Sequence, residues 1–132
     1  MILQTTLSLS AAAVVINVWH MIRIGRVRAA ERIIHGDAGN EALIRRMRAQ
    51  ANFIENVPLA LILIGLIEMT GAGGTWLAIV GAAFMLGRVA HVIGMDAPGP
   101  HVGRMVGTLI TMLTHVGLAV VAVLIATKNF PT

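Results

Sequence analysis

The chain has 132 residues, enough for one domain, and carries a net charge of +4. Apolar residues make up 57% and charged residues only 12%, whereas a typical soluble domain carries about 25% charged residues, so an ordinary soluble globule and a disordered chain are both excluded. Because cysteine and tyrosine are absent, disulfides, thiolate nucleophiles, cysteine-ligated metals and phenol acids are excluded too.

Four apolar segments, each long enough to cross a bilayer, follow one another along the chain. A span needs roughly 20 largely apolar residues, and these runs are too long and too uniform for strands. The first segment has no basic start and ends in arginine rather than a cleavage site, so we expect a retained helix and not a signal peptide. We predict one all-α membrane domain over residues 1–132, with transmembrane helices at about 2–24, 47–69, 75–95 and 103–127.

The connections between these segments predict how the helices are oriented. Residues 23–48 contain seven arginines and three acids, and the remaining charges cancel. Arginine-rich loops stay in the cytoplasm, so the first and third connections are expected there and both termini outside. The basic balance thus reflects membrane topology, with no nucleic-acid partner. We expect the first two helices to extend into the cytosol around a turn at HGDAGN (35–40), whereas GAGG (71–74) and PGP (98–100) predict tight hairpins.

Polar side chains collect in the cytoplasmic third of the predicted bundle, where they are costly and are functional candidates by default. Glu55 and Arg88 reach a similar depth on antiparallel helices and could form an ion pair that only fixes packing. The neighbourhood holds more donors than one carboxylate can use, which favours an anionic ligand entering from the cytoplasm. Helical spacing places Arg48, Asn52 and Glu55 on one face of the second helix, and Arg88 and His91 on one face of the third. Gln50 of the second helix and Arg104 at the start of the fourth lie in the same cytoplasmic third.

The same residues carry a resemblance to a known family. The segment RAQANFIENVP (48–58) resembles the second-helix signature of the MAPEG family, the membrane-associated proteins of eicosanoid and glutathione metabolism. The segment GRVAH (87–91) is similar to the third helix of the microsomal prostaglandin E synthase branch, and the similarity continues without a gap to Arg104. With the length, the four helices and the arginine-rich loop, the resemblance covers nearly the whole chain.

The resemblance implies a homotrimer of four-helix subunits with glutathione, the co-substrate, bound between neighbours. Arg104 falls at the position of the catalytic arginine, and a glutathione-binding arginine of the first helix corresponds to Arg26 or Arg28. The implied function is a glutathione-dependent transferase or peroxidase acting on lipophilic small molecules that arrive from the lipid bilayer. The implied glutathione-binding residues are Arg48, Gln50, Asn52, Glu55, Arg88 and His91.

The chemistry of glutathione suits this set. The forked guanidinium groups of arginine fit its two carboxylates, and the carboxylate of Glu55 fits its ammonium group. A nearby arginine, which does not deprotonate, stabilises the reactive thiolate over the thiol.

Other functions remain open at this point. Several family members contact glutathione through a tyrosine at the position of Met95, so a non-catalytic lipid- or glutathione-binding membrane protein is the main alternative. A small multidrug exporter would need an acidic residue in the first helix, which has none. A haem-binding anchor would use His91 and His115, which would share one bilayer depth only poorly. His115 is expected instead to form a hydrogen bond between helices.

Overall fold

The structure, a computed structural model that describes residues 1–131, consists of four α-helices and their connections. All four helices are long and apolar enough to cross a membrane, which confirms the predicted all-α membrane fold. The first two are longer than their apolar segments because the arginine-rich ends remain helical, as expected, with the turn near residues 35–40. The helices are α1 (Gln4–Glu31), α2 (Glu41–Met69), α3 (Thr75–Met95) and α4 (Val102–Ala126).

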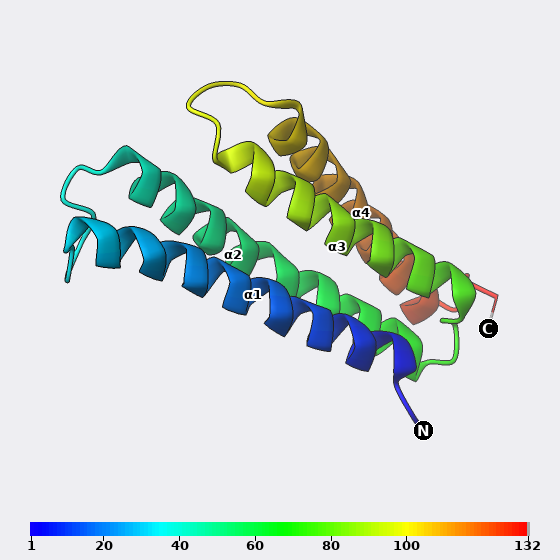
Figure 1. Ribbon diagram of the computed structural model, residues 1–132. Coiled ribbons are helices and arrows are strands. Elements are labelled where there is room, and N and C mark those ends of the chain that lie inside the picture. Colours follow the sequence, from blue (N-terminus) through cyan, green and yellow to red (C-terminus); the bar gives the residue numbers. More distant parts are fainter. Residues whose placement is uncertain (132) are drawn as a thin grey trace.

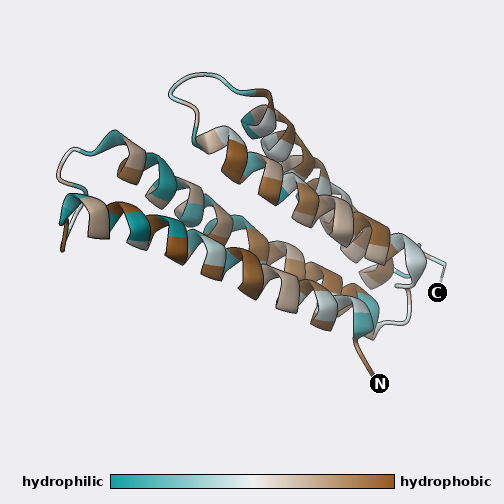
Figure 2. Ribbon diagram, viewed as in Figure 1, coloured by the Kyte–Doolittle hydropathy of each residue, from teal (hydrophilic) through white to brown (hydrophobic). Residues whose placement is uncertain are grey.

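The helices form two antiparallel hairpins, α1 with α2 and α3 with α4 (Figure 1). The central helices α2 and α3 contact each other, and within residues 1–131 α1 and α4 make no contact across the bundle. The α1–α2 and α3–α4 connections lie at one end, called the loop end below, and the α2–α3 connection and both chain termini lie at the other. Hydrophilic residues concentrate on α1 and α2 towards the loop end (Figure 2). The arrangement agrees with the predicted topology, and the side on which the loop end lies stays a prediction.

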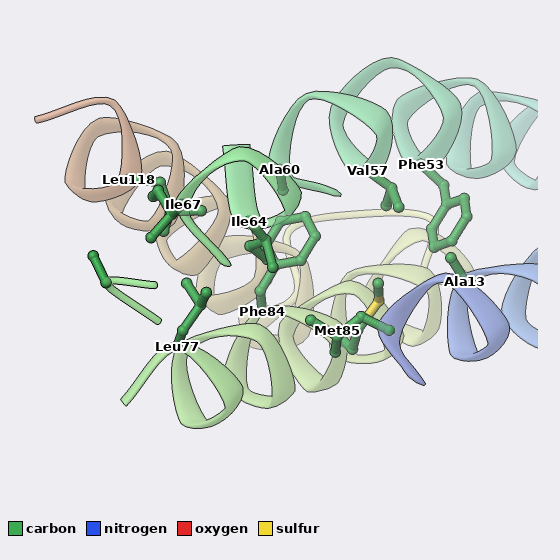
Figure 3. Packing of buried hydrophobic residues seen from close by; sticks show 12 residues of the cluster. Ala13, Phe53, Val57, Ala60, Ile64, Ile67, Leu77, Phe84, Met85 and Leu118 are labelled. Carbon is green, nitrogen blue, oxygen red and sulfur yellow. The ribbon is translucent and has the colours of Figure 1, made fainter. Parts of the chain in front are cut away.

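The apolar core occupies the half of the bundle away from the loop end. Ile64 of α2 and Phe84 of α3 meet near its centre, and both are fully buried (Figure 3). Phe53 marks the side of the core nearer the loop end. Because lipid tails are as apolar as these side chains, close packing rather than removal from water holds the helices together here. The loop-end half holds the buried polar residues Arg23, Arg88 and His91 beside a few buried apolar ones such as Leu43 and Val92.

Two of the helices, α2 and α4, begin at residues whose side chains accept hydrogen bonds from free backbone N–H groups. The Asn40 amide oxygen accepts from the N–H of Leu43 at the start of α2, and the Nδ1 atom of His101 accepts from Gly103 at the start of α4. At α1 the cap comes from another helix, because the Glu68 carboxylate accepts from the backbone of Thr5 and Thr6, at 2.8 and 2.9 Å. Glu68 therefore connects the start of α1 to the end of α2.

Glycines bring the backbones of α3 and α4 into direct contact. A Cβ atom added at Gly94 would overlap the backbone nitrogen of Arg104, and one added at Gly107 would lie 2.5 Å from the carbonyl oxygen of Gly87. Gly103 and Gly107 are four residues apart, the spacing at which small residues let membrane helices approach closely. This contact fixes the position of Arg104 against the end of α3.

Candidate functional site

A buried guanidinium connects three helices at the centre of the polar half. The side chain of Arg88 on α3 is only 1% exposed. It donates from Nη1 to the Thr111 hydroxyl on α4 at 2.9 Å and from Nη2 to the Asn52 amide oxygen on α2 at 2.5 Å. Its Nη2 lies 3.4 Å from Nδ1 of His91, and the Thr111 hydroxyl donates onward to the carbonyl of Gly107. The cluster of Asn52, Arg88, His91 and Thr111 therefore holds α2, α3 and α4 together.

The ion pair considered between Glu55 and Arg88 does not form. Neither residue takes part in any of the ion pairs found between described residues, and Glu55 is exposed on α2. Asn52, one turn nearer the loop end, lies at the depth of Arg88 and provides its acceptor on α2. The carboxylate of Glu55 is thus left on the outer surface of a helix that is apolar enough to span a membrane.

A groove of about 790 Å³ lies at the loop end between α2, α4 and the α3–α4 connection. Arg45 and Arg48 of α2 line one side and Arg104 of α4 the other. Met105 and Leu109 add an apolar wall. The groove therefore combines three cations with apolar side chains, an arrangement suited to an anionic ligand next to a lipophilic one.

The predicted site residues divide between the groove and the interior. Arg48 and Arg104, which are 56 positions apart in sequence, line the same groove. Asn52, Arg88 and His91 form the buried cluster behind it and do not line it. Glu55 lies two turns beyond Arg48 on α2, outside the residues that line the groove.

The remaining candidates lie at the α1–α2 interface or at the loop end of α1. Gln50 donates to the Asn17 side chain on α1, 3.2 Å away. Arg28 donates to the carbonyl of Gly36 and so supports the first connection, whereas Arg26 is exposed. None of these three side chains lines the groove in the described chain. His115 forms the interhelical bond expected of it, with Nε2 lying 3.0 Å from the carbonyl of Asn56.

An ionic contact between the hairpins was missed at the sequence level. Asp96, at the end of α3, pairs with Arg23 of α1 and lies 4.0 Å from Nε of Arg46 on α2. Arg46 also donates to the carbonyl of Arg23 at 2.8 Å, and the Arg23 guanidinium lies 5.0 Å from the centre of the Trp19 ring. A lone acid opposite an arginine-rich loop is the signal that could have revealed this contact.

The role of Arg45 in the groove was missed as well, although it precedes Arg48 by one helical turn.

These features define a multi-pass membrane protein with a cationic groove at the loop end of a four-helix bundle. The family model described as "MAPEG family" matches residues 6–124, and the chain belongs to the MAPEG family. The resemblance seen in the sequence is thereby confirmed.

Two curated relatives are similar to part of the chain. They carry the name "Inner membrane protein YecN" and come from Escherichia coli strain K12 and a strain of serotype O6:H1. Each is 36% identical over 70 residues, which cover 52% of this chain and 53% of the relative. The match thus spans about half the length of these relatives. No solved structure matches the chain at a significant level.

Proposed function

We propose that the protein is an integral membrane glutathione-dependent transferase or peroxidase acting on lipophilic electrophiles. The observation that carries this proposal is the convergence of Arg48 and Arg104 on one groove at the loop end. Glutathione has two carboxylates, and guanidinium groups bind carboxylates through paired, charge-assisted hydrogen bonds. The apolar wall at Met105 and Leu109 gives a lipophilic electrophile a place beside the thiol.

Glutathione in this proposal lies at the interface between subunits of a homotrimer. Glu55 supports this because its carboxylate, suited to the ammonium group of glutathione, is exposed on the surface of one subunit. A charge on the lipid-facing side of a helix is costly. A neighbouring subunit and its ligand would remove that cost by covering the face of α2 that carries Glu55.

The remaining predicted residues have supporting roles in this proposal. Arg88, His91 and Asn52 stabilise the interior behind the groove, and Asn52 connects Arg88 to the helix that carries Arg48. Gln50, which bonds to Asn17, holds α1 against the same helix. Either Arg26 or Arg28 would reach glutathione only across a subunit boundary, since neither lines the groove of its own subunit.

The proposed location is a bacterial inner membrane, with the loop end in the cytoplasm and both termini outside. The curated relatives are named as inner membrane proteins. The cluster of arginines at the loop end supports a cytoplasmic position for it. Cytosolic thiol would then enter the groove directly, and an electrophile would arrive from the lipid.

Isothermal titration of glutathione into the detergent-purified protein tests the proposal. We expect binding, and we expect Arg48→Ala to weaken it at least about tenfold, because a hydrogen bond to a charged group contributes about 1.5–3 kcal/mol. Arg32→Ala is the matched control, since Arg32 is an exposed arginine of the first connection that does not line the groove. If the parent protein shows no heat of binding, or if both variants bind like the parent, the glutathione site is rejected.

A second candidate function is a non-catalytic member that holds glutathione or a lipid. The observation that favours it is Met95, which lines the groove where a glutathione-contacting tyrosine would stand in several family members. Such a protein would bind ligand in the titration but show no turnover.

A further inference from the structure

The groove contains one more arginine than the proposed thiol chemistry uses. Arg45 lies beside Arg48 and lines the groove. Its ion pair within residues 1–131 is with Glu41, at 3.6 Å, and the side chain of Glu41 is 85% exposed. A solvent-exposed pair of this kind is weak. The guanidinium of Arg45 is therefore available to a ligand.

Apart from the weak pair of Arg45 with the exposed Glu41, the charge of this end of the groove is not neutralised locally. Within the described chain no acidic residue lines the groove. Asp96, which lies in sequence between two groove-lining residues, is already paired with Arg23 and lies near Arg46. Three guanidinium groups thus face a space that has no counter-charge of its own.

An apolar strip leads from this cationic end along α4. Met105, Leu109 and Met112 follow one another at intervals of four and three residues and so share one helix face. All three line the groove, and each is between 58% and 67% exposed. The strip lies within a helix that is apolar enough to span a membrane. The groove therefore presents a charged end and an apolar flank to an amphipathic molecule.

We propose that the Arg45 end of the groove binds the phosphate of an anionic phospholipid whose acyl chain lies along the strip on α4. Basic pockets between membrane helices bind anionic lipid headgroups in this way. Charge complementarity and the continuous apolar flank select a lipid rather than a free phosphate ion, which would gain nothing from the strip. This proposal rests on the groove of the proposed function and names the class of lipid that the groove takes. Because lipid binding is measured without glutathione, it can fail while glutathione binding succeeds, and the reverse.

Native mass spectrometry of the full chain in mild detergent tests the proposal by lipid titration. Phosphatidylglycerol is compared with phosphatidylcholine of the same acyl chains. We expect the anionic lipid to bind several-fold more tightly, and Arg45→Gln to weaken its binding about fivefold, the change that follows from about 1 kcal/mol per basic side chain near the membrane surface. Arg45→Lys, which keeps the charge, should recover most of the affinity, and Arg32→Gln should leave it unchanged.

Each of the other outcomes overturns the proposal. Equal binding of the two lipids would show that the headgroup is not recognised. A loss with Arg32→Gln equal to that with Arg45→Gln would show a diffuse attraction to the whole loop end. Displacement of the lipid by an equal concentration of glycerol phosphate would show a phosphate site that does not use the apolar strip. Circular dichroism spectra of the variants that match the parent confirm that folded proteins are compared.

Discussion

At the scale of single residues, arginines of the polar half have two different environments. Arg88 is buried and hydrogen-bonded to uncharged acceptors on two other helices, whereas Arg48 is exposed at a groove. Sequence spacing identified both as candidates but did not separate them. Spacing shows which residues share a face of one helix, and it does not show which face meets a neighbouring helix. That choice depends on helix packing, and here it placed Asn52 rather than Glu55 against Arg88.

Replacing the acceptor of Arg88 tests its structural role. We expect Asn52→Leu to lower the free energy of unfolding by about 1.5–3 kcal/mol, because a hydrogen bond to a buried charged group is lost. Thermal unfolding in detergent measures this change. Asn52→Asp keeps an acceptor and should lose less stability, and Arg48→Gln, at an exposed position, should stay within about 0.5 kcal/mol of the parent. Equal stability of Asn52→Leu and the parent would contradict the role of the cluster.

The effect of replacing Arg104 distinguishes an enzyme from a non-catalytic binding protein. If Arg104 stabilises the thiolate more than the thiol, its effect is greatest where negative charge develops on sulfur. We expect Arg104→Ala to reduce turnover of glutathione with chlorodinitrobenzene by on the order of 10²-fold, the scale for one electrostatic donor. Glutathione affinity should change much less. Turnover that is unchanged in the variant, or absent from a parent protein that binds glutathione, would favour the binding protein.

At the scale of helices, hydropathy predicted the bundle well because span length and apolar composition are local properties. The predicted third helix has the bounds observed for α3, and the others differ only at their ends. The hairpin of α3 and α4 was predicted from PGP (98–100), but the direct backbone contact between these helices was not, although Gly103 and Gly107 have the spacing typical of close helix pairs. Glycines are common in membrane helices, so this spacing alone does not identify the partner helix or the depth of contact.

The close approach of α3 and α4 can be tested with one added methyl group. At Gly94 a Cβ atom would overlap the backbone of Arg104. Backbone cannot move aside as a flexible side chain can, so we expect Gly94→Ala to push the start of α4 outward, lower the melting temperature and reduce turnover. Gly117→Ala is the control, because a Cβ there meets nothing within 4 Å and alanine favours helix. A Gly94→Ala protein as stable and active as Gly117→Ala would refute the backbone contact.

At the scale of the whole molecule, the predicted site residues do not all line one groove. The groove lies at the loop end, and Glu55 lies further along α2 on an exposed face. Leu59, Ile62 and Leu66 continue that face at helical intervals, and each is more than half exposed. Sequence reasoning could propose candidate residues for the site through the family resemblance. It could not show that some of them line the groove while Glu55 lies on a separate exposed face of α2. Which side chains end up inside and which outside depends on how the helices pack.

We expect this face of α2 to be covered by neighbouring copies in a homotrimer. The cost of a charged residue at the centre of a membrane helix is about 2.5–3.5 kcal/mol on insertion scales, and covering Glu55 with a second subunit and its ligand removes it from lipid. Native mass spectrometry in mild detergent should show three copies per particle. Because the chain has no cysteine, Ile62→Cys adds a single thiol to the face, and oxidation within the membrane should join subunits by a disulfide. Monomers alone in the mass spectrum, with no cross-linked species after oxidation, would show that this face contacts lipid and that the site is completed in some other way.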